Sequence, residues 1–194
     1  MSARIEQVTK AMLALESAFL IGVEGATELL LVRHADCYRD MQEFEDPPLS
    51  ALGREQAERL GRRVRGLHPD AVYSSPYRRA METARAVTED VHVDQRLVEM
   101  PLVIGEDGTL EFQEAADSAV ARMNAVIDDV VAEHAGRRVV LVSHAASILA
   151  CLSDALHIEQ GHLRLLPYYT SISTLRVLGD RRMVGSLGDV AHLE

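Results

Sequence analysis

Three short apolar segments of this 194-residue chain each stop at a pair of polar residues, and this pattern constrains the fold more than any other feature. The segments at 28–32, 71–73 and 139–142 are followed directly by Arg33-His34, Ser74-Ser75 and Ser143-His144. Short apolar runs of this kind are typical of strands buried on both faces of a sheet. We therefore expect three buried strands with polar side chains at their carboxyl ends.

Helical patterns alternate with these segments. Ser50 is placed to cap a helix that ends between Gly66 and Pro69, and Ser75 and Pro76 are placed to begin another that continues to residue 88. Further helices are expected over residues 112–133 and 145–156. Strands that alternate with helices predict an α/β fold, a three-layer sandwich with a mostly parallel sheet flanked by helices. Such sheets bind ligands at the carboxyl ends of their strands, where the polar pairs lie.

The remaining patterns are shorter. Residues 91–93 are a further strand candidate, and residues 101–108 are expected to form a loop because of their Gly, Pro and Asp content. Residues 172–178 and 183–187 flank Gly179-Asp180 and predict a hairpin or edge pair.

The N-terminal segment carries a helical stripe. Ile5, Val8, Met12, Leu15 and Phe19 recur at alternating steps of three and four residues, which places them on one side of a helix. We expect residues 1–25 to be an amphipathic helical extension and residues 26–194 to be the catalytic domain. The stripe fits a helix packed on its own domain, and it also fits a dimer seam because the repeat matches a short heptad pattern.

Charge and cysteine content limit the partners. The net charge of −10 argues against bulk binding to nucleic acid or to an anionic membrane surface. Lys10 is the only lysine, so any anionic substrate must be captured locally by arginine, whose planar guanidinium can grip two phosphate oxygens. Cys37 and Cys151 are too few for a disulfide-stapled scaffold, and a reducing, cytoplasmic setting fits best. The apolar stretch from Ala11 to Val23 is interrupted by Glu16, so it resembles neither a signal-peptide core nor a membrane span.

The polar strand ends suggest phosphoryl transfer. A neutral imidazole is a competent nucleophile near pH 7, so His34 is predicted to carry the phosphoryl group. Negative charge on the transferred group requires donors around it, and Arg33 and Arg79 are the candidates. The leaving alkoxide needs a proton, for which Glu99 is the best-placed donor. Glu106 and Asp107 are the alternatives for this last role.

Five motifs then resemble one family. LVRHA at 31–35, PLSALGREQA at 48–57, SSPYRRAMETA at 74–84, VSH at 142–144 and AHL at 191–193 look like the histidine phosphatase superfamily, the phosphoglycerate mutase-like group. The resemblance implies that His34 is phosphorylated, that Arg33 and Arg79 bind phosphate, that His144 is the second pocket histidine and that Glu99 is the acid/base. It also implies a phosphoglycerate mutase-like fold, no metal and no other cofactor. Arg78 is then a solvated helix residue.

Four positions depart from the family pattern. Ala35 and Ala145 follow the two histidines where the mutase branch usually has glycine, and the added methyl at Ala145 could narrow the approach to phosphate. Cys37 and Asp40 stand where many members have other polar residues, so those secondary phosphate contacts are in question. Cys37 is expected to be a small residue at the pocket edge.

The leading hypothesis is therefore a metal-independent phosphatase of the histidine acid phosphatase type, a phosphomonoester hydrolase that acts on a small-molecule substrate. The short segment between Glu99 and Phe112 favours it, since mutases of this family usually carry longer insertions there. The alternatives are a phosphoglycerate mutase-like phosphotransferase and a non-catalytic module that binds a phosphorylated ligand or forms a homodimer.

Overall fold

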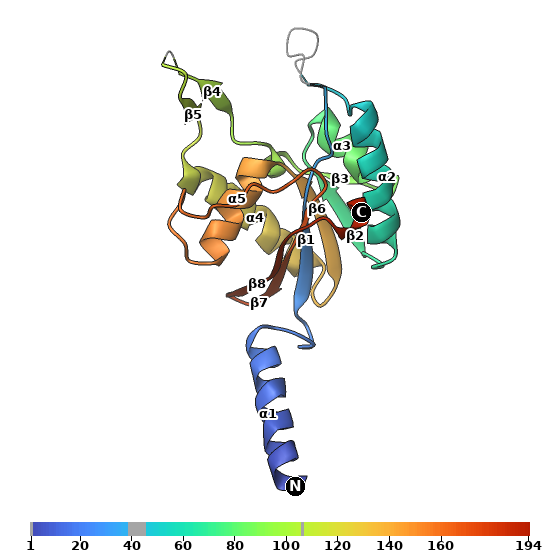
Figure 1. The fold of residues 1–194 in the computed structure, drawn as a ribbon, viewed down its shortest axis with the longest axis vertical. Coiled ribbons are helices and arrows are strands. Elements are labelled where there is room, and N and C mark those ends of the chain that lie inside the picture. Colours follow the sequence, from blue (N-terminus) through green and yellow to red (C-terminus); the bar gives the residue numbers. More distant parts are fainter. Residues whose placement is uncertain (1, 39–45, 106) are drawn as a thin grey trace.

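The computed structural model describes residues 2–38, 46–105 and 107–194. The helices are α1 Ser2–Ala18, α2 Ala51–Arg65, α3 Arg78–Arg85, α4 Ala116–Glu133 and α5 Ala145–Ala155, with 3₁₀ turns η1 Gln95–Leu97 and η2 Ala191–Leu193. The strands are β1 Thr27–Arg33, β2 Ala71–Ser74, β3 His92–Val93, β4 Leu102–Ile104, β5 Leu110–Phe112, β6 Arg138–Ser143, β7 Ile172–Leu178 and β8 Arg181–Asp189. Figure 1 shows their arrangement around a central sheet.

The central sheet runs in the order β3-β2-β6-β1-β7-β8. Strands β3, β2, β6 and β1 are parallel, whereas β7 pairs antiparallel with β1 and β8 pairs antiparallel with β7. The mostly parallel α/β fold is therefore confirmed, as are the three buried strands and the hairpin at Gly179. Arg33 pairs with Ser143, and Ser74 pairs with Val142. The polar strand ends therefore lie at one level along the same edge of the sheet.

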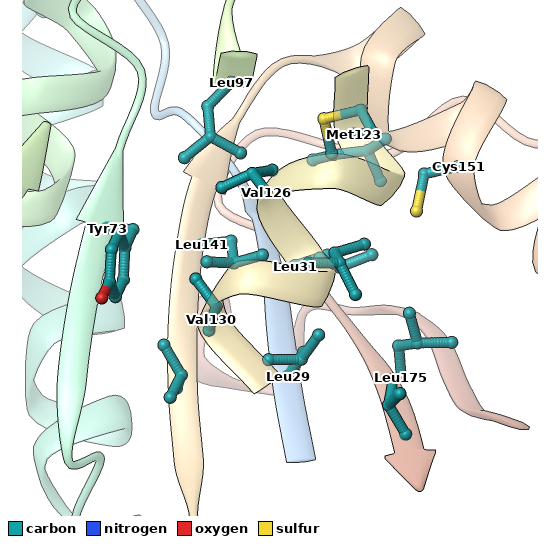
Figure 2. Close-up of a cluster of buried hydrophobic side chains, with 14 of the residues drawn as sticks. Leu29, Leu31, Tyr73, Leu97, Met123, Val126, Val130, Leu141, Cys151 and Leu175 are labelled. Atoms are coloured by element: carbon teal, nitrogen blue, oxygen red, sulfur yellow. The ribbon is translucent and has the colours of Figure 1, made fainter. Parts of the chain in front are cut away.

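The two faces of the sheet are covered by different helices. Leu29 and Leu31 of β1 belong to the cluster under α4 and α5, and Figure 2 shows Val126 and Val130 of α4 in that cluster. Leu30 and Val32 belong to the cluster under α2 and α3. Because neighbouring residues of a strand point to opposite faces, the continuous apolar run of β1 supplies both cores. The result is a three-layer sandwich.

The start of α2 fixes the segment that follows β1. The hydroxyl of Ser50 accepts a hydrogen bond from the N–H of Gly53 at 2.9 Å, which confirms the predicted N-cap. Gly53 lies against the backbone of Asp36 so closely that a Cβ would collide with its carbonyl oxygen. Glycine is therefore required here for α2 to support the chain just after His34.

The start of α3 corrects one prediction. It begins at Arg78, with Tyr77 at the N-cap position, and it ends at Arg85. Ser75 and Pro76 do not open the helix, because the N–H of Ser75 continues the strand ladder by donating to Val142 at 3.0 Å. Strand pairing therefore extends to the residue that the local Ser-Pro signal predicted as the cap of the helix.

The segment after Glu99 corrects a second prediction. Residues 101–108 were expected to be a loop, but β4 and β5 form an antiparallel hairpin that pairs Leu102 with Phe112. The glycine and aspartate content marks only its turn, where Gly108 has a positive φ of 83°. Helix α4 consequently begins at Ala116 and not at residue 112.

Helix α1 projects away from the sheet, at the end opposite the β4–β5 hairpin (Figure 1). The guanidinium of Arg181 donates to the carbonyl of Ala18 at 2.7 Å and so holds the end of the helix. All five stripe residues are at least half exposed: Ile5, Val8, Met12, Leu15 and Phe19. The expectation that this stripe packs on its own domain is wrong, because α1 leaves the body of the protein before its apolar side can be covered.

Candidate active site

His34 lies at the carboxyl end of β1 and is almost fully buried. Its backbone N–H donates to the carbonyl of Ser143 at 3.0 Å, which extends the pairing with β6. Its ring Nδ1 lies 2.7 Å from the carbonyl oxygen of Ala35. Since a carbonyl can only accept, Nδ1 carries the proton, and the lone pair of the neutral ring lies on Nε2. That lone pair accepts the N–H of Arg79 Nε at 3.3 Å.

The environment keeps this ring uncharged. Burial lowers the pKa of His34 from 6.5 to about 3, and the positive charges of Arg79 and Arg33 add to the effect. Desolvation and nearby cations both disfavour a second proton on the imidazole. His34 is therefore present as the neutral, nucleophilic form at neutral pH.

His144 lies beside His34 at the end of β6. The two ring centroids are 5.0 Å apart, and Nε2 of His144 lies 2.9 Å from the hydroxyl of Ser75. Burial holds the pKa of His144 well below its ordinary value, with further contributions from His34 and Arg79. Within residues 2–38, 46–105 and 107–194, its Nδ1 is buried without a hydrogen-bond partner. A buried nitrogen of this kind is available to a ligand.

Arg33 is held by the segment that precedes β7. Its Nη1 donates to the carbonyl of Pro167 at 2.8 Å, and its guanidinium carbon lies 3.9 Å from the ring centroid of Tyr169. The next residue, Thr170, has a φ of 58°, a left-handed conformation that is rare for a β-branched residue. The N–H of Thr170 donates to the carbonyl of Arg33 at 3.0 Å, and its hydroxyl lies 3.0 Å from Nε2 of His192. The strained backbone of Thr170 therefore orients the ring of Tyr169 against Arg33.

Arg79 comes from the first turn of α3. Its guanidinium carbon lies 4.7 Å from the ring centroid of Tyr77, and its Nη1 lies 3.5 Å from a carboxylate oxygen of Asp46. The hydroxyl of Thr83 donates to the carbonyl of Arg79 at 2.7 Å and accepts the N–H of Ala35 at 2.9 Å. One threonine therefore joins the arginine helix to the segment that carries His34.

Glu99 lies at the N-terminus of α5. Its carboxylate accepts the N–H groups of Met100 at 2.9 Å, Ser147 at 3.1 Å and Ala146 at 3.4 Å. Helix N-termini favour carboxylates because their first N–H groups lack partners inside the helix. Glu99 is also one of the residues that line the cavity described next, so it is both a cap of α5 and a neighbour of any ligand bound there.

Of the two alternatives to Glu99, the structure describes only Asp107, and it lies elsewhere. Asp107 lies at the tip of the β4–β5 hairpin, where it accepts from the N–H and hydroxyl of Thr109 at 3.0 and 2.6 Å. Asp107 is not among the described residues that line the cavity. Glu106 and Asp40 fall outside the described residues.

A cavity of about 580 Å³ opens beside the two arginines. It is lined by Arg33, Tyr77, Arg79, Glu99, Met100, Pro101, Leu102, Phe112, Ala145, Ala146, Leu149 and Leu166. Ala145, the first residue of α5, is one of the residues that line this cavity, as its position after His144 suggested. Cys37 forms a backbone bridge with Leu49 and does not line this cavity.

The structure thus brings Arg33, His34, Arg79 and His144 together as the sequence predicted, and it places Glu99 at the neighbouring cavity. Sequence reasoning missed the contacts of Ser75, Tyr77, Thr83 and Tyr169 with these residues. Three of them lie within the 74–84 motif, so their proximity to Arg79 was a usable signal. Tyr169 had none, because only the long connection from α5 to β7 brings it to Arg33.

The described residues hold no group of three or more His, Cys, Asp or Glu side chains arranged to bind a metal ion. None of their helices is both long enough and apolar enough to cross a membrane.

Comparisons with known proteins agree with this architecture. The chain is 29% identical to phosphoserine phosphatase 1 of Hydrogenobacter thermophilus over 163 residues, which cover 68% of this chain and 77% of the relative. It is 27% identical to phosphoglycerate mutase-like protein 4 of Arabidopsis thaliana, over 86% of this chain and 87% of the relative. The structure of phosphoserine phosphatase from Entamoeba histolytica, in complex with 3-phosphoglyceric acid, superposes with a TM-score of 0.74 at 23% identity, over 87% of this chain and 100% of that one.

The chain belongs to the histidine phosphatase superfamily. Within it, the family model that matches is that of branch 1, in two overlapping segments at residues 29–113 and 105–190. The match includes all five residues that were singled out from the sequence, from Arg33 to His144.

Proposed function

We propose that this protein is a metal-independent phosphomonoester hydrolase that acts through a phosphohistidine at His34. The observation that carries the proposal is the fixed tautomer of His34, with Nδ1 bonded to Ala35 and Nε2 directed at Arg79. A neutral imidazole with its lone pair beside a guanidinium is prepared to attack a phosphorus atom whose oxygens that guanidinium binds.

In the first step, Nε2 of His34 forms a bond to phosphorus while the bond from phosphorus to the substrate's alcohol oxygen breaks. The N–H of Arg79 must leave Nε2 for this, and the phosphate offers it stronger, charged acceptors. Arg33 also donates to the phosphate, through an Nε that is buried without a partner among the described residues. His144 donates to the same group from Nδ1, which has no partner among the described residues, while its Nε2 accepts from the hydroxyl of Ser75.

The proposed proton donor is Glu99. Its carboxylic acid gives a proton to the departing oxygen, so the alcohol leaves neutral. In the second step a water molecule attacks phosphorus, Glu99 removes its proton, and the bond from phosphorus to Nε2 breaks. Inorganic phosphate leaves, and both His34 and Glu99 return to their starting states.

A phosphoglycerate mutase-like phosphotransferase is the second candidate, and the similarity to the Arabidopsis relative favours it. The size of the segment after Glu99 favours the hydrolase, because its described residues form only the β4–β5 hairpin, which is too small to enclose the cavity. A phosphoenzyme that water can reach is expected to be hydrolysed before it returns its phosphoryl group to a second substrate position.

The experiment is a measurement of phosphate release and isomerisation on the same samples. Purified protein in excess chelator should release phosphate from p-nitrophenyl phosphate, and His34→Ala should remove at least 99% of this activity. 3-Phosphoglycerate should give no 2-phosphoglycerate. Isomerisation that exceeds phosphate release would favour the mutase, and an absence of turnover and labelling with every phosphomonoester would favour the non-catalytic module.

Residues 1–25 are proposed to be an extension that forms a homodimer, and residues 26–194 the catalytic domain. The 3-4-3-4 spacing of the exposed stripe is self-complementary, so a second copy of α1 is the partner it fits best. Because α1 lies at the end of the sheet opposite the hairpin, pairing leaves the active site open (Figure 1). A cytoplasmic location is proposed on the cysteine content, and the net charge of −10 favours small-molecule partners over nucleic acid.

A further inference from the structure

The cavity beside the arginines has two chemically different ends. Arg33, Arg79 and Glu99 form the polar end, and the Nε of Arg79 lies 3.3 Å from Nε2 of the proposed nucleophile, His34. The rest of the wall is apolar and comes from four places: the N-cap of α3, the β4–β5 hairpin with the two residues before it, the first turns of α5, and the connection before β7. Its members are Tyr77, Met100, Pro101, Leu102, Phe112, Ala145, Ala146, Leu149 and Leu166. A ligand whose phosphate lies at the arginines must place the remainder of its structure against this wall.

Several of these apolar side chains are exposed to solvent. Leu166 is 73% exposed, Phe112 is 53% exposed and Leu102 is 49% exposed. Single exposed apolar residues are common on protein surfaces, but a set that converges on one cavity marks a place where a ligand covers it. When an apolar ligand covers these three side chains, the apolar surfaces of the ligand and of the protein both leave water, which favours binding.

The charges exclude a second anionic group on the ligand. Among the described residues that line the cavity, Arg33 and Arg79 are the only cations, and the phosphate uses both. The nearest acid, Glu99, would repel a carboxylate. Arg122 is already bound to Glu114 at 2.8 Å and does not line the cavity. Phosphoserine and phosphoglycerate would each leave a carboxylate without a partner, and burying an unpaired charge is costly.

Resting on the phosphatase function proposed above, we infer that the substrate is a phosphomonoester of an apolar alcohol, with an aryl or medium-chain alkyl leaving group. The apolar wall binds the hydrocarbon, and the arginines bind the phosphate. The cavity of about 580 Å³ is within the range of pockets for ligands of this size.

The test uses the full chain and a series of monoalkyl phosphates from ethyl to octyl, with 1-naphthyl phosphate, phosphoserine and 3-phosphoglycerate. Phosphate release should give kcat/KM values that rise with chain length, by up to about fourfold for each methylene that is buried. Phosphoserine and 3-phosphoglycerate should be at least 100-fold poorer than octyl phosphate. If either is hydrolysed as well as octyl phosphate, the inference is wrong and the phosphatase function stands.

Two variants test whether the apolar wall binds the hydrocarbon part of the substrate. Phe112→Ser should lower kcat/KM for octyl and naphthyl phosphate at least fivefold and change the value for ethyl phosphate less than twofold. Its matched control is Leu187→Ser on β8, which replaces a side chain of similar exposure away from the cavity and should leave the whole series unchanged. Equal losses with every substrate in Phe112→Ser would overturn the assignment of the apolar wall.

Binding separates this inference from the proposed function. Calorimetry with octylphosphonate and with 3-phosphonopropionate, neither of which can be hydrolysed, needs no turnover. Octylphosphonate should bind at least 100-fold more tightly, and Phe112→Ser should reduce that difference. Tight octylphosphonate binding without any hydrolysis would overturn the phosphatase and keep the ligand class, whereas equal binding of the two phosphonates would overturn the ligand class.

Discussion

The Nε of Arg79 lies 3.3 Å from Nε2 of His34, and this contact joins the end of β1 to the first turn of α3. It fixes which ring nitrogen of His34 holds the lone pair, and it places a guanidinium where a transferred phosphoryl group would develop negative charge. Thr83 stabilises the arrangement by bonding to the backbone of both segments. Sheet and helix together therefore position a nucleophile and its anion-binding partner.

Two adjacent arginines test this relationship. Arg79→Ala should lower kcat/KM about 100-fold to 1000-fold, the usual cost of losing one donor to a transition-state oxyanion. Arg78→Ala should change it less than twofold, because Arg78 is largely exposed and pairs with Glu82 at 2.7 Å. Steady-state phosphate release measures both variants. Similar losses in the two variants would show that α3 needs either arginine for its structure and would contradict a specific role for Arg79.

Glu99→Gln tests the proton donor through the leaving group. With an alkyl phosphate, whose alkoxide leaves poorly, kcat/KM should fall about 100-fold or more because no acid protonates the oxygen. With p-nitrophenyl phosphate the fall should be less than tenfold, since nitrophenolate leaves without a proton. Glu99 also accepts N–H groups of α5, so a purely structural role would lower both values equally and would contradict the proposal.

The buried histidines predict a pH dependence of stability. Burial lowers the pKa of His34 to about 3 and holds that of His144 well below its ordinary value of 6.5. Between pH 6.5 and 5 the unfolded chain therefore binds protons at these positions and the folded chain does not. The free energy of unfolding should fall with falling pH, by up to about 1.4 kcal/mol per pH unit for each histidine.

Urea denaturation at several pH values measures this slope. His34→Asn should make the slope shallower over that range, whatever its effect on stability at pH 7. The matched control is His162→Asn, because the side chain of His162 is mostly exposed and its replacement should leave the slope unchanged. A slope in His34→Asn that equals the wild-type slope would contradict the neutral, buried state of His34.

The sequence predicted the parts of the site that local patterns determine. An apolar run that ends in Arg33-His34 must place both at the carboxyl end of a buried strand, and the same applies to His144. The Ser50 cap and the hairpin at Gly179 are equally local. Their catalytic roles stay predictions, since geometry shows only that these groups meet.

Other features depended on contacts that no local pattern contains. Ser75 does not begin a helix because its N–H donates to a carbonyl of strand β6. The β4–β5 hairpin was missed because the turn residues of its segment dominate the local composition. Tyr169 reaches Arg33 only through the fold. The stripe on α1 predicted a helix correctly, but periodicity identifies an apolar side without identifying the surface that covers it.

Met12→Glu tests the partner of that stripe. Sedimentation of the wild-type chain should show a dimer, and Met12→Glu should shift it to a monomer by placing a charge in the seam. Gln7→Glu is the control, because it makes the same change of charge on another side of α1 and should keep the dimer. Activity per chain should stay within twofold in both variants. A wild-type monomer, or a dimer that persists in Met12→Glu, would contradict the pairing of α1.

The central claim is tested most directly by trapping the phosphorylated protein. Rapid acid-free quenching during turnover of a phosphorus-labelled aryl phosphate, followed by peptide mass spectrometry, should find one phosphoryl group on His34. The bond should be stable in base and lost in acid, and His34→Ala should show neither the label nor phosphate release. Turnover without a labelled histidine, or turnover that survives in His34→Ala, would contradict the mechanism.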